Sequence, residues 1–175
     1  MKLNVKLIKA NKEWLGPYQE FYDEWFKSGE KMVPWVIRES SNDAEAMFSF
    51  LQKQETGVGL SASQVKNTTY WLINEEEEVV GAVNIRHTLN SFLFEQGGHI
   101  GYGIRPSARQ KGYATQILAL ALQESNKLGI KKVLVCCDED NLASYKTIVK
   151  NGGMIDEDFV TDDGEVIKRF WVECE

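Results

Sequence analysis

The chain has 175 residues, of which 43% are hydrophobic and 26% are charged, as in an ordinary soluble globular protein. Its formal net charge of -6 argues against nucleic acid as the main partner. No apolar run approaches the roughly 20 residues that a membrane-spanning helix needs, so we expect no membrane partner either. The length predicts a single domain covering residues 1–175.

The N-terminal third predicts one strand and two helices. Alternating polar and apolar residues over Lys2–Ile8 indicate a strand. Apolar residues recur at spacings of three and four over Asn11–Lys27, which predicts an amphipathic helix. Asn42 or Asp43 can cap a second helix. The polar, glycine-containing segment Glu55–Lys66 predicts a loop that can border a substrate pocket.

The middle of the chain predicts three further strands. Thr69–Asn74 and Val79–Arg86 flank the acidic run Glu75–Glu78, which is typical of a solvated hairpin tip. His87–Gly98 is expected to be a connection, partly strand. His99–Arg105 is predicted to be the next strand, and it ends before Pro106.

The C-terminal half alternates helices and strands. Ala114–Leu128 predicts a helix that ends with Gly129 at the C′ position, and Lys132–Cys137 predicts a buried strand. A helix should open at Asn141 and end at Gly152, and Val160–Val166 indicates a hairpin turn. Two strands joined through a helix imply a parallel pair with a right-handed crossover.

The cysteines predict a reduced, cytoplasmic protein. Cys136, Cys137 and Cys174 form no CxxC pair, and the chain has only two His residues. Neither a structural zinc site nor a disulfide framework is therefore expected. The N-terminus lacks the apolar core of a signal peptide.

The loop Gln110–Thr115 is the strongest candidate binding site. It leads from a strand into a helix N-terminus, where backbone N–H groups lack intrahelical partners and the helix dipole favours an anion. Gly112 allows close approach of a ligand, Ala114 keeps the first turn thin, and Arg109 and Lys111 add positive charge. An ordinary strand-to-helix turn remains the alternative for so short a motif.

These residues resemble the phosphate-loop pattern of the GNAT acetyltransferase superfamily. The matching residues are Arg109, Gly112 and Ala114, the lead-in Ile104-Arg105-Pro106, and downstream Asn141, Ser144 and Gly152. The resemblance is specific over residues 99–153. The segment Gly98–Pro106 is similar to that of a bacterial subgroup of predicted acetyltransferases. It implies an α/β fold with a mixed, twisted central sheet, helices on both faces and a splayed parallel strand pair.

The resemblance also implies an acetyl-CoA site without a metal. The pyrophosphate is expected on the loop amides and the pantetheine arm beside the preceding strand. The implied cofactor-binding residues are Tyr102, Gly103, Ile104, Gln110, Lys111, Gly112, Tyr113, Ala114, Thr115 and Asn141. A simple helix cap is the alternative role of Asn141.

The catalytic residues are less clear from the sequence. In many family members a Tyr acts as the general acid at the position where this chain has Ile148. Tyr145 is the catalytic candidate for the acid, with a packing role as its alternative, and Ser144 is another possible donor. His99 is the candidate base, because an imidazole can accept a proton near neutral pH, although it can equally be a strand-edge residue bonded to a neighbour.

The predicted function is transfer of an acetyl group from acetyl-CoA to a primary amine of a small molecule or protein. The expected partners are acetyl-CoA and this unidentified amine acceptor, and a homodimer is compatible with the sequence. The absence of a Tyr at Ile148 motivates an alternative, a non-catalytic acyl-CoA-binding or sensing module. A different nucleotide-binding α/β protein is a third interpretation.

Overall fold

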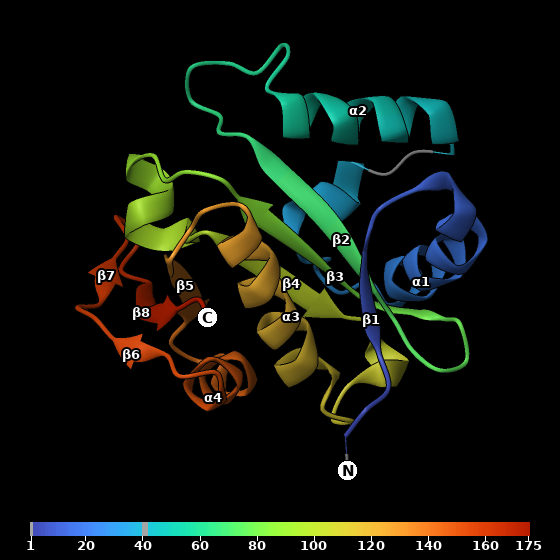
Figure 1. Ribbon diagram of the computed structural model, residues 1–175. Helices are drawn as coiled ribbons and strands as arrows, with labels where there is room; N and C mark the ends of the chain where they lie inside the picture. The colour runs from blue at the N-terminus through green and yellow to red at the C-terminus, as the bar shows by residue number, and fades with distance from the viewer. Residues whose placement is uncertain (1, 40–41) are drawn as a thin grey trace.

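The computed structural model describes residues 2–39 and 42–175, and its strands form two antiparallel sheets (Figure 1). The first sheet has the order β1-β2-β3-β4 and consists of β1 (Lys6–Lys9), β2 (Asn67–Ile73), β3 (Val79–Arg86) and β4 (Ile100–Ile104). In the second sheet β8 (Val166–Glu173) pairs with β5 (Lys132–Asp138), β6 (Met154–Ile155) and β7 (Phe159–Val160).

Helices cover both faces of the first sheet (Figure 1). On one face lie α1 (Leu15–Ser28), α2 (Ala44–Thr56) and the 3-10 turn η2 (Trp35–Glu39). On the other lies α3 (Tyr113–Lys127), which also contacts α4 (Leu142–Lys150). Neighbouring residues of β2 separate the two cores, because Trp71 packs on the α1 side and Leu72 on the α3 side. The predicted α/β class with helices on both faces is confirmed.

Polar side chains begin the helices where the sequence predicts them. Asp43 Oδ1 accepts a hydrogen bond from the Ala46 amide at 3.2 Å, which decides between the two predicted caps of α2. Asn141 Oδ1 accepts from the Ser144 amide at 3.1 Å and caps α4. At the end of α3, Gly129 has a φ of 85° and its N–H donates to the Asn126 carbonyl, as predicted for a C′ glycine.

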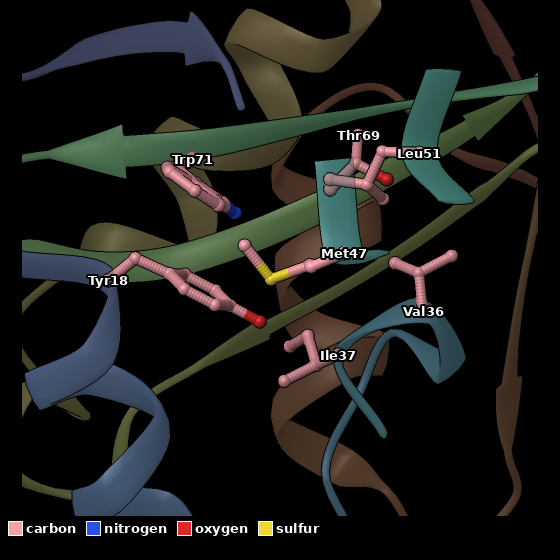
Figure 2. A pocket seen from close by; sticks show the side chains of 7 residues that line it. All are labelled: Tyr18, Val36, Ile37, Met47, Leu51, Thr69 and Trp71. Atoms are coloured by element: carbon pink, nitrogen blue, oxygen red, sulfur yellow. The ribbon is translucent and has the colours of Figure 1, made fainter. Parts of the chain in front are cut away.

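Aromatic packing fixes α1 to the sheet (Figure 2). The rings of Tyr18 and Trp71 stack with centroids 4.2 Å apart, and the Met47 side chain extends toward them from α2. The cavity at this point measures about 10 Å³, enough for one water at most. It is a packing gap within the core and has no room for a substrate.

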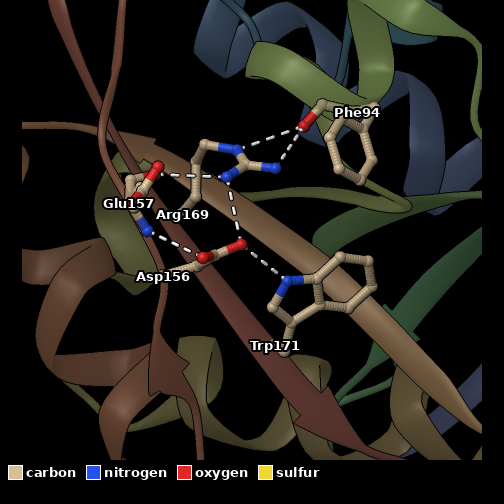
Figure 3. Close-up of polar contacts among 5 residues, drawn as sticks. All are labelled: Phe94, Asp156, Glu157, Arg169 and Trp171. Atoms are coloured by element: carbon tan, nitrogen blue, oxygen red, sulfur yellow. Dashed lines mark hydrogen bonds and ion pairs between the residues drawn. The ribbon is translucent and has the colours of Figure 1, made fainter.

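One predicted element is wrong. Part of His87–Gly98 was expected to be a strand, but Leu93–Gly97 forms a π-helical turn, η3. Asn90 Oδ1 caps it by accepting from the Leu93 amide at 2.9 Å. Arg169 of β8 donates to the Phe94 carbonyl and pairs with Asp156, which ties this turn to the second sheet (Figure 3).

The two sheets meet at one residue pair. The His99 amide donates to the Leu134 carbonyl at 2.7 Å, and the Leu134 amide donates to His99 Nδ1 at 2.9 Å. Gly98 is required beside this junction, since a Cβ there would lie 2.6 Å from the Leu134 carbonyl oxygen. Beyond this junction β4 and β5 form no hydrogen-bonded ladder with each other. The expected parallel pair is therefore two neighbouring strands that splay apart.

His99 is neutral at this junction. Burial, with a smaller contribution from nearby Arg86, lowers the pKa of its imidazole to about 4. A neutral ring is also what the bond requires, because Nδ1 must carry a lone pair to accept from Leu134.

The protein should lose stability through His99 as the pH falls from about 7 to about 5. Unfolded His takes up a proton near pH 6.5, whereas folded His99 stays neutral until about pH 4. The unfolded state binds more protons across this window, so the free energy of unfolding falls with pH. Thermal unfolding at several pH values should show a drop of a few degrees.

The matched variant is His99→Asn, which keeps a side-chain acceptor and removes the titration. Its melting temperature should depend less steeply on pH than that of the wild type. Part of the slope should remain, because burial also lowers the pKa of His87, and His87→Asn measures that part. A wild-type slope in His99→Asn would contradict this assignment.

Candidate active site

The gap between β4 and β5 is where the predicted site residues gather. The helix α3 follows β4 and α4 follows β5, so both helix N-termini lie at the carboxyl ends of the two splayed strands. This is where α/β sheets generally bind ligands.

The edge of β4 that faces the gap carries main-chain groups without a ladder partner. The Arg86 amide donates to the His99 carbonyl at 2.7 Å, and the Arg105 amide donates to the Val80 carbonyl at 3.0 Å. Because main-chain groups alternate along an antiparallel strand, those of Tyr102 and Ile104 point away from β3 and into the gap. The Ile104 carbonyl accepts from Arg109 Nε at 3.1 Å, which leaves its amide and both groups of Tyr102 for a ligand.

Gly103 has a packing role that the sequence did not predict. By the same alternation its amide and carbonyl face β3. A Cβ at this position would lie 2.3 Å from the Val33 carbonyl oxygen and 2.5 Å from the Trp25 ring. The glycine therefore lets the segment after α1 pack on β4, and a cofactor contact by Gly103 stays a prediction.

The loop from Gln110 to Thr115 forms a concave row of donors. Gln110 and Gly112 have positive φ values of 62° and 88°, and the turn delivers the chain into α3 at Tyr113. The first helical bond here runs from the Gln116 amide to the Gly112 carbonyl, so the amides of Tyr113, Ala114 and Thr115 have no intrahelical partner. Such a row at a helix N-terminus suits a phosphate group.

The positive charge of the loop comes from Lys111. Arg109, the other predicted contributor, forms an ion pair with Glu30 at 2.6 Å and lies over the Trp25 ring at 5.4 Å. Its guanidinium thus ties the loop to α1 and is neutralised there. Lys111 forms no ion pair with any residue that the structure describes.

Glu24 of α1 anchors the start of the loop. Its carboxylate accepts from the Arg105 guanidinium and, at 2.8 Å, from the Ser107 amide. Burial alone would raise the pKa of Glu24, but the hydrogen bonds from Arg105 and Ser107 outweigh it and the pKa is lowered. The loop geometry therefore depends on an ionised Glu24.

The two predicted catalytic residues both have structural contacts. Tyr145 packs edge-on against Phe170 with ring centroids 5.1 Å apart. The His99 ring holds Leu134 and has a pKa of about 4, which makes it a weak base at neutral pH. Ile148, the position where the resemblance implied a Tyr, is fully buried in the core.

A hydroxyl pair that the sequence did not predict connects the two strands' sides of the gap. The Tyr102 hydroxyl lies 2.9 Å from Ser144 Oγ, which connects β4 to the first turn of α4. Burial raises the pKa of Tyr102 to about 12, so the phenol stays protonated at neutral pH. Alternation along β4 predicts only which face Tyr102 occupies; its distance to Ser144 depends on how far the strands splay.

Asn141 is the cap of α4, as the alternative interpretation predicted. Its Oδ1 is occupied by the Ser144 amide. The cap holds Ser144 in the first helical turn, opposite Tyr102. A contact between Asn141 and a cofactor stays a prediction.

The comparison with protein families identifies the class of protein. A family model described as an acetyltransferase (GNAT) domain matches residues 16–154, which includes β4, the donor loop, β5 and α4. The chain therefore belongs to the GNAT acetyltransferase family. No curated protein sequence matches it.

Solved structures with the same fold are distant in sequence. A spermidine N-acetyltransferase SpeG chimera from Vibrio cholerae and hSSAT aligns with a TM-score of 0.66 at 13% identity, over 97% of this chain and 95% of that one. An N-acetyltransferase from Staphylococcus aureus Mu50 has a TM-score of 0.64 at 16% identity, over 98% and 99%. The yncA protein from Salmonella typhimurium, solved with acetyl-CoA, has a TM-score of 0.64 at 13% identity, over 98% and 94%.

Residues 2–39 and 42–175 contain neither a candidate metal site nor a candidate membrane span. No group of three or more His, Cys, Asp or Glu residues there is arranged to hold a metal ion. None of the helices in this part of the chain is long and apolar enough to span a membrane.

Replacing Glu24 with Gln should loosen the loop. The Arg105 side chain is 12% exposed and would lose its ionised partner, at a cost of about 1–3 kcal/mol in the free energy of unfolding. Urea denaturation measures this cost. Glu20→Gln removes the same charge from an exposed position of the same helix and should change stability little; equal effects of the two variants would contradict the anchoring role.

Proposed function

We propose that this chain transfers an acetyl group from acetyl-CoA to a primary amine. The observation that carries the proposal is the open edge of β4 beside a row of free loop amides. An extended, hydrogen-bonding arm can pair with Tyr102 and Ile104 while the attached pyrophosphate lies on the amides from Gln110 to Thr115. The family match and the fold shared with an acetyl-CoA complex support the same cosubstrate.

The residues around the gap fit this cosubstrate. A Cβ on Gly112 would have one atom within 4 Å, Leu3 Cδ1 at 3.4 Å, so the outer side of the loop is open to a ligand. Lys111 supplies a cation for the phosphates, and Asn141 is proposed to contact the cosubstrate at the N-terminus of α4. No metal is needed for the transfer.

The reaction is a direct displacement. The amine nitrogen forms a bond to the thioester carbon, and the carbon–sulfur bond breaks. The nitrogen loses one proton and the leaving thiolate gains one, which yields the amide and CoA.

The Tyr102 hydroxyl is the better placed of the two tyrosines to protonate the thiolate. It lies in the gap, bonded to Ser144, on the strand whose edge would bind the pantetheine arm. Tyr145, the candidate acid one turn before Ile148, has its ring against Phe170. Proton removal from the amine is assigned to solvent, because the ring of His99 is engaged with Leu134.

The loop assignment is tested by Gly112→Glu. A carboxylate at this position would repel the pyrophosphate and weaken CoA binding by on the order of 100-fold, measured by calorimetric titration. Gly129→Glu is the matched control, because Gly129 has a similar positive φ of 85° at the opposite end of the same helix. Unchanged affinity in a folded Gly112→Glu protein would disprove the site.

The proton donor is tested by Tyr102→Phe and Tyr145→Phe, which each remove one hydroxyl. Tyr102→Phe should lower kcat by about 100-fold and leave the KM for acetyl-CoA nearly unchanged. Tyr145→Phe should retain a kcat close to that of the wild type. The opposite ranking would assign the acid to Tyr145.

A non-catalytic acyl-CoA-binding or sensing module is the second candidate. Two observations favour it: Ile148 is buried in the core, and His99 is a poor base. CoA binding without turnover of any amine would support this alternative over acetyl transfer.

A further inference from the structure

A second, larger cavity lies on the α2 side of the first sheet. It measures about 250 Å³ and opens between the end of α2, the loop before β2 and the segment that leads into η3. This volume is just below the range typical of drug-sized ligands, so a small molecule fits it. The loop Glu55–Lys66, which the sequence placed beside a substrate pocket, contributes to its wall.

The walls of this cavity are mostly neutral. Trp35, Phe92 and Leu93 are apolar, and Gln54 and Asn67 are polar. Arg86 is the only charged side chain among the described residues that line it. The cavity therefore offers one cation and no carboxylate.

Arg86 differs from three other arginines of the chain in having no carboxylate partner among the described residues. It donates to the carbonyls of Gly97 and Gly98 at 3.2 and 3.4 Å and forms no ion pair with the residues that the structure describes. Three other arginines each have a carboxylate partner, in the pairs Arg105–Glu24, Arg109–Glu30 and Arg169–Asp156. Burial lowers the pKa of Arg86 to about 10, which reflects the cost of keeping its charge without a counter-ion.

Two of the residues that line the cavity, Gln54 and Asn67, belong to a buried polar network. Asn84 Nδ2 donates to Asn67 Oδ1 at 2.8 Å and to Thr69 Oγ1 at 3.2 Å, and Asn67 Nδ2 donates to Gln54 Oε1 at 2.9 Å. Asn84 is fully buried and its Oδ1 has no protein partner. Polar groups on a buried sheet face are costly, and Asn67 of this network is the cross-strand partner of Arg86.

Arg86 connects the cavity to the gap between β4 and β5. A Cβ on Gly101 would lie 3.1 Å from Arg86 Nη2, so the guanidinium rests directly on β4. Gly101 is next but one to His99, where the strands separate, and its side of β4 is opposite to that of Tyr102. A molecule held by Arg86 therefore approaches the gap from the face opposite the Tyr102 hydroxyl.

We propose that the acceptor is a small amine that also carries a carboxylate, of the α-amino acid class with an apolar side chain, and that Arg86 binds this carboxylate. The proposal rests on the proposed acetyl transfer. The cavity supplies apolar walls for the side chain and a guanidinium that can bind a carboxylate through two donors. A polyamine, which is cationic throughout, finds only a like charge here.

The test compares acceptors that differ only in the carboxylate. Leucine, methionine and phenylalanine are each paired with their carboxamides, and spermidine is added as a polycation. Calorimetric titration onto CoA-saturated protein measures binding, and release of CoA from acetyl-CoA measures turnover. At least one amino acid should bind about tenfold or more tightly than its amide and should have the higher kcat/KM.

Variants of Arg86 separate recognition from structure. Arg86→Met should lower kcat/KM for the preferred amino acid by about 50-fold, mainly through KM, and should leave its amide almost unaffected. Arg86→Lys should restore part of the preference, because it keeps the charge. Arg38→Met removes an exposed arginine of η2 and should match the wild type. CoA affinity is measured for every variant to show that the fold is retained.

The possible failures are distinguishable. If CoA binds and no amino acid binds more tightly than its amide, or if spermidine is the preferred acceptor, the proposal about Arg86 is overturned while acetyl transfer stands. An equal loss for amino acid and amide in Arg86→Met would give Arg86 a structural role and overturn it as well. If the wild type does not bind CoA, the proposed function itself fails.

Discussion

The two hydrogen bonds between His99 and Leu134 are the constraint on which the rest of the site depends. They join β4 to β5 at one point, and from there the strands separate. The main-chain groups of Tyr102 and Ile104 are consequently left without a ladder partner, which would be unfavourable if they were buried away from both water and a ligand. A charged His99 could not accept from Leu134, so the junction also requires a neutral imidazole. The same separation brings the N-termini of α3 and α4 to one gap, where free amides and the Tyr102–Ser144 pair face a ligand.

Local signals in the sequence were sufficient for most elements, because helix caps and periodicity depend on near neighbours. Asp43, Asn141 and Gly129 occupy the predicted terminal positions, and the strands β2, β3 and β5 lie where apolar patterns indicated them. The π-helical turn η3 was missed, since contacts from Arg169 on a distant strand help to hold it. The sequence was a weaker guide to which way individual residues face and which partners they have. Gly103 faces β3, and Arg109 is paired with Glu30, because tertiary contacts decide both.

The net charge of the chain and the charge inside the larger cavity point to different classes of acceptor. A net charge of -6 is mildly compatible with a cationic substrate, yet Arg86 is the one charged side chain among the described residues that line the larger cavity. Surface charges act over a Debye length in water, whereas an unpaired cation in a partly buried cavity acts directly on its ligand. The sequence could not identify Arg86 as a candidate ligand-binding residue, because it is the last residue of β3 and a polar residue is common at the end of a strand. Its meaning comes from the absence of a carboxylate around it, which only the fold reveals.

The account depends on where CoA binds, and a crystal structure of the protein with CoA tests this most directly. It should contain the pyrophosphate on the amides from Gln110 to Thr115, the pantetheine arm paired with Tyr102 and Ile104, and the sulfur near the Tyr102 hydroxyl. The His99–Leu134 bonds should remain intact in that complex. CoA bound elsewhere, or β4 and β5 closed into one continuous ladder with no ligand between them, would contradict the account.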